Sequence, residues 1–145
     1  MTDFKLDEFL PYQLAVAASR VSRAFSAHYI EKFGISTPEW RVVAHLSQEG
    51  SVSVREIHRR VDMDKSKVSR AAGRLEAAGY ISKSENRSDR RLVELQLTDK
   101  GREMIDQLAP VARGFEQELL AHLGEDGATF RGALDDLLNA MAAKH

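Results

Sequence analysis

The sequence predicts a mainly α-helical protein of the α+β class, a winged helix-turn-helix with long N- and C-terminal helices on either side. Two observations predict this fold. Between Ser53 and Gly101, two short amphipathic helical patterns precede two strand-like runs around an arginine-rich turn. Outside this stretch, apolar residues recur at helical spacing over segments long enough for extended helices.

The composition is that of an ordinary globular protein. Its 145 residues suit one sizeable core, with 43% hydrophobic and 30% charged residues. No run is long and apolar enough for a membrane span, and the N-terminus lacks a signal-peptide pattern, so we expect a cytoplasmic location. The chain has no cysteine, which excludes disulfides and thiolate metal sites within it.

The first half of the chain predicts two helices. One runs from 6 to 33, either kinked at Pro11 or beginning just after it, with Gly34 as its natural stop. The next begins at Thr37, interpreted as its N-cap, and places Pro38 where a missing N–H costs nothing. This helix is expected to end near Gly50.

Helix caps mark the remaining elements. Ser53 and Glu56 have capping-box spacing, Asp64 can cap the following helix, and Gly79 can close it. Strands are predicted at 81–85 and 92–97. Thr98 then caps a long helix that Pro110 should kink, and a last helix runs from about 125 to 143.

Charge is unevenly distributed along the chain. The stretch 55–91 contains eleven Lys and Arg against six Asp and Glu, whereas the remainder contains ten against sixteen. In the helix after Asp64, the residues outside the apolar stripe include Lys65, Ser66, Lys67, Ser69, Arg70 and Arg74. Such a face fits the major groove of DNA, although a solvated charged surface is the plainer interpretation.

The turn between the two strands reads Asn86-Arg-Ser-Asp-Arg-Arg91. Arginine at such a tip can enter a minor groove, and a neighbouring Asp can orient its guanidinium. We therefore add Arg87, Asp89, Arg90 and Arg91 to the candidate DNA-binding residues. A polar hairpin turn without function is the alternative.

These motifs together resemble the MarR (multiple antibiotic resistance regulator) family over nearly the whole chain. The matching segments are Ile35-Ser-Thr-Pro-Glu-Trp-Arg-Val42, Ser66-Lys-Val-Ser-Arg70, Arg74-Leu-Glu-Ala-Ala-Gly79, Ser88-Asp-Arg-Arg91 and Leu97-Thr-Asp-Lys-Gly101. The family's wing signature is Asp-x-Arg followed by a strand and Leu-Thr-x-x-Gly. By this resemblance, Arg91 is the minor-groove arginine and Asp89 its orienting partner.

The resemblance implies one MarR-like domain over 1–145. Residues 36–101 would form the DNA-binding lobe, and 1–33 and 102–145 the dimerisation helices. It further implies a homodimeric transcription factor, most often a repressor, that reads a palindromic operator in double-stranded DNA. Small anionic or phenolic compounds commonly release such proteins from DNA. A winged-helix interaction scaffold without specific DNA binding is the alternative.

An effector site is indicated more weakly. Trp40 with Arg41 suits an aromatic carboxylate, and Tyr12 and His28 are further candidates for polar contacts. The plainer interpretation makes Trp40 a core residue and pairs Arg41 with an acid such as Glu39.

Catalytic and metal-binding patterns do not emerge from the sequence. We find no nucleophile with a base and no phosphate-cradling glycine loop, so we expect neither an enzyme nor a cofactor. The five histidines, His28, His45, His58, His122 and His145, form no close metal-ligand motif and are interpreted as ordinary core or surface residues.

Overall fold

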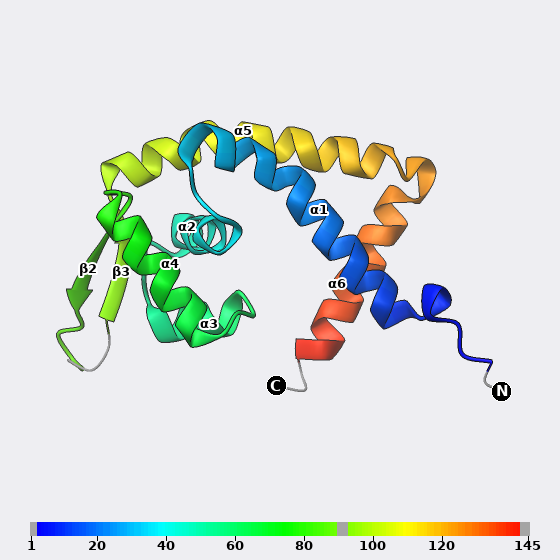
Figure 1. Cartoon of the computed structure of the whole chain (residues 1–145), viewed down its shortest axis with the longest axis horizontal. Helices are drawn as coiled ribbons and strands as arrows, with labels where there is room; N and C mark the ends of the chain where they lie inside the picture. The colour runs from blue at the N-terminus through cyan, green and yellow to red at the C-terminus, as the bar shows by residue number, and fades with distance from the viewer. Residues whose placement is uncertain (1–2, 90–92, 143–145) are drawn as a thin grey trace. The chain divides into compact units, whose positions relative to one another are not determined.

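The computed structural model describes residues 3–89 and 93–142. The chain divides into two compact units, Met1–Leu108 and Ala109–His145, which are described separately. The first unit contains η1 (Leu6–Glu8), α1 (Leu10–Phe33), α2 (Thr37–Glu49), β1 (Ser51–Ser53), α3 (Val54–Arg60), α4 (Lys65–Ala77), β2 (Ile81–Glu85), β3 (Val93–Leu97) and the beginning of α5 (Asp99–Ala121) (Figure 1). The second unit contains the rest of α5, η2 (Gly124–Asp126) and α6 (Gly127–Ala142).

A small antiparallel sheet closes the lobe that contains α2, α3 and α4. Its strand order is β1-β3-β2, with Val52 opposite Leu95 and Ile81 opposite Leu97. The predicted hairpin of β2 and β3 is confirmed, whereas β1 was not predicted. The observed fold is therefore a winged helix-turn-helix with a three-stranded sheet, in agreement with the predicted class.

Side-chain caps fix where the short helices begin. Ser53 Oγ accepts a hydrogen bond from the Glu56 N–H at 3.2 Å, and Asp64 Oδ1 accepts one from the Lys67 N–H at 2.9 Å. Both predicted caps are confirmed. The prediction for α2 was wrong by one residue, because Ser36 is its N-cap and forms a reciprocal capping box with Glu39.

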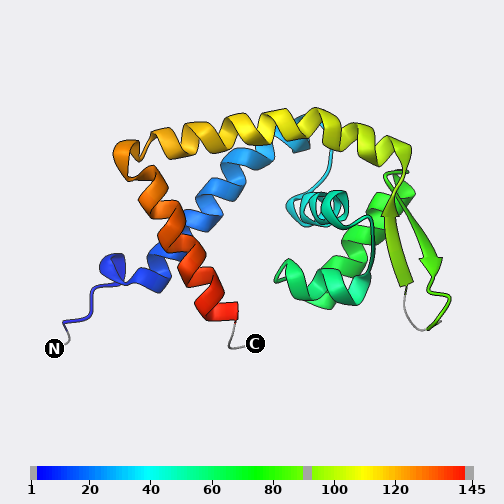
Figure 2. The same ribbon diagram turned by 180° about the vertical axis from the view of Figure 1, so that it is seen from behind.

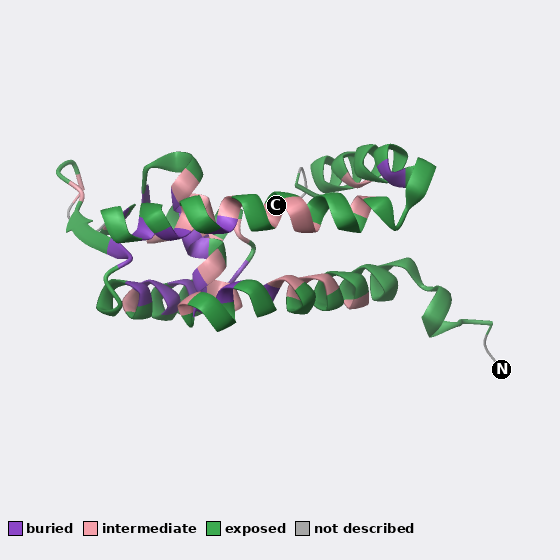
Figure 3. Cartoon of the chain, turned by 90° about the horizontal axis from the view of Figure 1, so that it is seen from above, coloured by how far each residue is buried: buried purple, intermediate pink, exposed green. Residues whose placement is uncertain are grey.

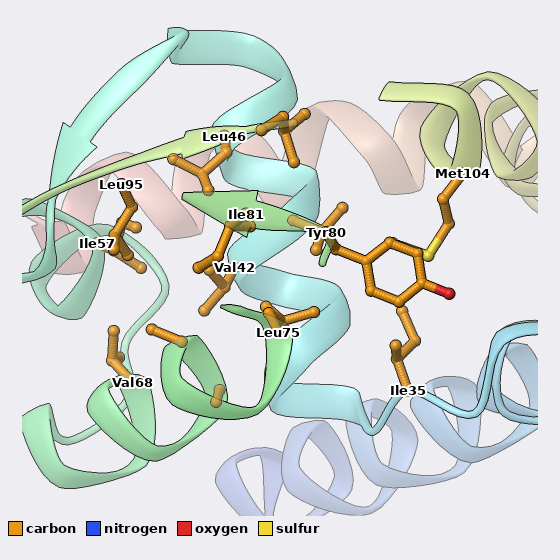
Figure 4. Packing of buried hydrophobic residues seen from close by; sticks show 14 of the residues in the cluster. Ile35, Val42, Leu46, Ile57, Val68, Leu75, Tyr80, Ile81, Leu95 and Met104 are labelled. Carbon is orange, nitrogen blue, oxygen red and sulfur yellow. The ribbon is translucent and has the colours of Figure 1, made fainter. Parts of the chain in front are cut away.

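The core of the first unit lies between α2, α4 and the sheet. Figure 4 shows Val42 of α2, Leu75 of α4 and Leu95 of β3 within one cluster, and each is fully buried. Ala71 and Ala72 are also fully buried, and their small side chains allow α4 to approach α2 closely. The opposite face of α4 is consequently left for solvent.

The junction between α4 and α5 is joined by side-chain hydrogen bonds. Thr98 Oγ1 donates to the Gly79 carbonyl at 2.6 Å and accepts from the Gly101 N–H at 3.1 Å, which confirms Thr98 as the cap of α5. Lys100 Nζ donates to the Ala78 carbonyl at 2.7 Å and lies 4.6 Å from the centroid of the Tyr80 ring. These bonds hold the root of the hairpin, seen from behind in Figure 2.

The long helices expose apolar side chains. Most of the first half of α1 is exposed in the single chain (Figure 3), including Leu10 at 58% of its surface. In the second unit, α6 leaves Leu138 exposed at 60% and Met141 at 50%. α5 continues through Pro110. Apolar side chains exposed over this much of a helix exceed what is usual on a surface that faces only solvent.

Candidate nucleic-acid interface

α4 presents a basic face opposite its buried stripe. Val68 and Leu75 point into the core with no exposed surface, and Asp64 caps the helix at its start. The predicted DNA-binding residues of α4 are all exposed: Lys65, Ser66, Lys67, Ser69, Arg70 and Arg74. The fold thus separates this helix into an apolar half that packs and a basic half that is available for contact.

Three of these cations form a row along α4. Lys67, Arg70 and Arg74 follow one another at spacings of three and four residues, which places them on one face of a helix. Lysine and arginine offer several N–H donors, which can pair with guanine acceptors in the major groove or with backbone phosphates. The row therefore has the chemistry and the regular spacing that contact with duplex DNA requires.

The turn between α3 and α4 is short and well anchored. Asp62 adopts a left-handed conformation with φ 54°, which Asp tolerates better than most residues. His58 Nδ1 donates a hydrogen bond to the Met63 carbonyl at 2.6 Å. His58 is thus a structural residue that fixes how α4 leaves the turn.

The hairpin of β2 and β3 forms the wing, and Asn86 organises the beginning of its turn. Asn86 Oδ1 accepts hydrogen bonds from the backbone N–H groups of Ser88 at 2.8 Å and Asp89 at 3.0 Å. Its Nδ2 donates to Glu94 of β3. This turn leaves Arg87 exposed and Asp89 half-buried. The remaining wing candidates, Arg90 and Arg91, lie outside the described residues.

Trp40 belongs to an aromatic cluster between α1 and α2. Its ring stacks on Tyr29 at 5.5 Å between centroids and meets Phe25 edge-on at 5.3 Å. Phe25 also lies 5.9 Å from the ring of His28. The Tyr29 hydroxyl donates to Thr37 Oγ1 at 2.9 Å, so α1 is bonded directly to the first turn of α2. The structure thus brings Trp40 and His28 to one cluster.

Glu39 pairs with Arg74 of α4, at 3.5 Å, and not with Arg41. The alternative pairing of Glu39 with Arg41 was wrong, because residues two apart on a helix point to different sides. Arg41 is exposed beside Trp40. Glu39 was not predicted as a functional residue, although its three-residue spacing from Ser36 is a recognisable capping signal.

Tyr12 lies far from the aromatic cluster. It is sixteen residues before His28 on the same helix, which separates the two by about 24 Å at the usual rise per residue. Tyr12 instead lines a cavity of about 340 Å³ beside the start of α1. The other residues lining this cavity are Asp7, Gln13, Val16, Ala17 and Arg20. One small molecule in a single protomer cannot touch Tyr12 and Trp40 together.

Comparison with known proteins identifies the family. The sequence model of the MarR family matches residues 33–92. The chain is 32% identical over 97 residues to the transcriptional repressor MdtR of Bacillus subtilis, and 35% identical over 94 residues to the transcriptional regulator TtmR of Methylorubrum extorquens. These alignments cover 67% and 65% of this chain but only 63% and 46% of the two relatives, less than two thirds of either.

A solved structure matches over nearly its full length. The MarR family transcriptional regulator SPO1453 of Silicibacter pomeroyi superposes with a TM-score of 0.82 at 30% identity, covering 96% of this chain and 99% of that one. The chain belongs to the MarR family. The MarR family relatives named above are transcriptional regulators, and their winged helix-turn-helix is a DNA-binding fold.

The MarR signature after the wing has a clear structural cause in this chain. A Cβ at Gly101 would lie 2.2 Å from the Tyr80 carbonyl oxygen, so only glycine fits there. Thr98, three residues earlier, bonds both to Gly101 and back to Gly79. The Leu-Thr-x-x-Gly pattern therefore encodes the joint between the wing and α5.

In the described ranges of this MarR family member, 3–89 and 93–142, no helix is both long and apolar enough to cross a membrane. Within the same ranges, no group of three or more His, Asp or Glu side chains has an arrangement that could hold a metal ion.

Proposed function

We propose that this chain is a homodimeric repressor that places α4 of each protomer in the major groove of a palindromic operator. The observation that carries the proposal is the exposed row of Lys67, Arg70 and Arg74, opposite a fully buried apolar stripe. A helix with this division can dock without disturbing the core. The identity to transcriptional regulators of the same family supports the proposal.

The candidate residues have distinct proposed functions. Ser66, Lys67, Ser69 and Arg70 contact base edges and flanking phosphates, and Lys65 and Arg74 contact the backbone at either end. Arg91 enters the minor groove, with Asp89 orienting it and Arg87 and Arg90 contributing phosphate contacts. The α4 residues project from one helix, so their mutual spacing is fixed before DNA arrives.

Dimerisation is proposed to use the terminal helices. The exposed apolar residues Leu10 and Leu14 of α1, and Phe130, Leu138 and Met141 of α6, are surfaces that a second copy can bury. A two-fold dimer presents two copies of α4 and so reads two half-sites about one helical turn of DNA apart. A palindromic operator follows from this symmetry.

DNA affinity is expected to fall steeply with salt. Four cations on each α4, in two protomers, give about eight phosphate-neutralising groups, and hence a slope of roughly −7 in a plot of log K against log salt concentration. Fluorescence anisotropy with a labelled DNA duplex, titrated at several salt concentrations, measures this slope. A flat dependence would favour the interaction scaffold over the DNA-binding regulator.

We further propose that an aromatic carboxylate releases the protein from DNA by binding at Trp40 and Arg41. Trp40 supplies an aromatic wall next to Phe25 and Tyr29, and the exposed Arg41 guanidinium can grip a carboxylate bidentately. His28 lies beside Phe25 at the same cluster and is the further polar candidate. Tyr12 remains a candidate only for a separate subsite at its own cavity.

Arg41→Ala should raise the concentration of aromatic carboxylate needed for release about 30-fold, because one charge-assisted bidentate contact contributes roughly 2 kcal/mol. DNA affinity should stay within about twofold, since Arg41 lies on α2 and not in the basic row of α4. The measurement is dissociation of the protein–DNA complex by sodium benzoate at constant ionic strength. Arg20→Ala is the matched control, since Arg20 lines the cavity beside Tyr12. Loss of response in Arg20→Ala alone would move the effector site to that cavity.

A further inference from the structure

Arg74 is the last cation of the basic row on α4, and it differs from the others in having a buried partner. Its Nε lies 3.5 Å from Oε2 of Glu39, across the interface between α4 and α2. The Glu39 side chain is only 9% exposed, whereas the Arg74 side chain is 55% exposed. The pair therefore links a fixed carboxylate in the lobe to a guanidinium at its surface.

The carboxylate of Glu39 has little freedom to move. Ser36 donates to Oε2 from both its backbone N–H and its hydroxyl, while the Glu39 N–H donates back to Ser36 Oγ at 3.3 Å. This capping box fixes Glu39 to the first turn of α2. The same turn is bonded to α1 through Thr37 and Tyr29. A carboxylate fixed in this way can restrict the guanidinium that forms an ion pair with it.

The ion pair with Glu39 is made through Nε, so it does not use the two terminal nitrogens of the Arg74 side chain, which is 55% exposed. Each terminal nitrogen carries two N–H donors, a geometry suited to two oxygens of one phosphate group. A free arginine loses considerable rotamer entropy when it binds, and prior ordering reduces this loss. The fixed Glu39 supplies such ordering before DNA is present.

We infer that Glu39 is a positioning residue that holds Arg74 ready for a DNA backbone phosphate. This inference rests on the proposed function, because it assigns Glu39 a part in DNA binding by α4. For removal of Glu39, the inference predicts a change in DNA affinity opposite in sign to the change that charge alone would cause. Removing a carboxylate near DNA should strengthen binding if only its charge mattered, whereas removing a positioning residue should weaken it.

The test is a double-mutant cycle in DNA affinity, using Glu39→Ala, Arg74→Ala and the double variant. We expect Arg74→Ala to weaken binding about tenfold and Glu39→Ala about fivefold. In the Arg74→Ala background, Glu39→Ala should change affinity by less than twofold, because its effect acts through Arg74. Both losses should be similar on operator and on unrelated duplex, as phosphate contacts carry no sequence information.

Glu56→Ala is the matched control for loss of a carboxylate from the first turn of a helix. Glu56 lies three residues after the cap Ser53 of α3 and pairs with Arg60 rather than Arg74, so its loss should not weaken DNA binding. Urea unfolding of each variant checks that its fold is intact. Stronger binding by Glu39→Ala, an equal loss in both backgrounds, or an equal loss in Glu56→Ala would each overturn the inference. Absence of salt-dependent DNA binding in the unaltered protein would overturn the proposed function as well.

Discussion

Gly101→Ala is expected to destabilise the fold by about 3 kcal/mol, the upper range for inserting a methyl group into a packed site. The added Cβ would lie 2.2 Å from the Tyr80 carbonyl oxygen and 3.0 Å from Leu97 Cδ2. That carbonyl already accepts a hydrogen bond from the Thr98 N–H at 3.0 Å. The backbone at both Tyr80 and Gly101 therefore has to shift to admit the methyl group. Urea unfolding followed by circular dichroism measures the change.

Gly73→Ala is the control, because Gly73 is also helical but has nothing within 4 Å of its Cβ position. Alanine there should leave stability unchanged or raise it by up to about 1 kcal/mol, since glycine disfavours helix interiors. Equal stability of the Gly101→Ala and Gly73→Ala variants would contradict the close contact between Gly101 and the Tyr80 carbonyl oxygen.

Arg70→Ala is expected to weaken operator binding roughly 10- to 100-fold, corresponding to the roughly 1–3 kcal/mol of one bidentate base contact. Arg70 is exposed in the middle of the basic row, between Lys67 and Arg74. It makes no contribution to the buried stripe, so the fold should be unaffected. Anisotropy titrations on operator and on a scrambled duplex separate lost affinity from lost specificity.

Arg102→Ala is the matched control for net charge. Arg102 is an exposed arginine of α5, paired with Asp99 at 2.9 Å, and its loss removes the same formal charge. We expect its DNA affinity to stay within about twofold of the unaltered protein, since distant exposed charges are screened by salt. If both variants lost affinity equally, general electrostatics would explain the binding and α4 would have no special place in it.

Local side-chain chemistry made much of the fold predictable. The caps Ser53, Asp64 and Thr98 were correct because each places an oxygen where a helix leaves N–H groups unpaired, a signal that lies within four residues. The Thr37 prediction failed because both Ser36 and Thr37 can cap a helix. In the structure Ser36 is the cap, and the Thr37 hydroxyl instead accepts a hydrogen bond from the Tyr29 hydroxyl.

Features that depend on distant partners escaped prediction. β1 is only Ser51-Val-Ser53 and has too few residues for an alternating pattern, so it exists through its pairing with β3, more than forty residues later. The pairing of Glu39 with Arg74 likewise requires α2 to lie against α4. Helical spacing alone was enough to place the α4 candidates on one exposed face. The separation of Tyr12 from Trp40 could be seen only from the path of α1.

The position of Trp40 also provides a spectroscopic probe. It is the single tryptophan of the chain, and its indole stacks on Tyr29 beside the proposed effector site. Selective excitation of the indole therefore reports on this cluster alone, without an engineered label. A compound that inserts next to the ring changes its emission directly, so occupancy can be titrated in the absence of DNA and compared with release measured in its presence.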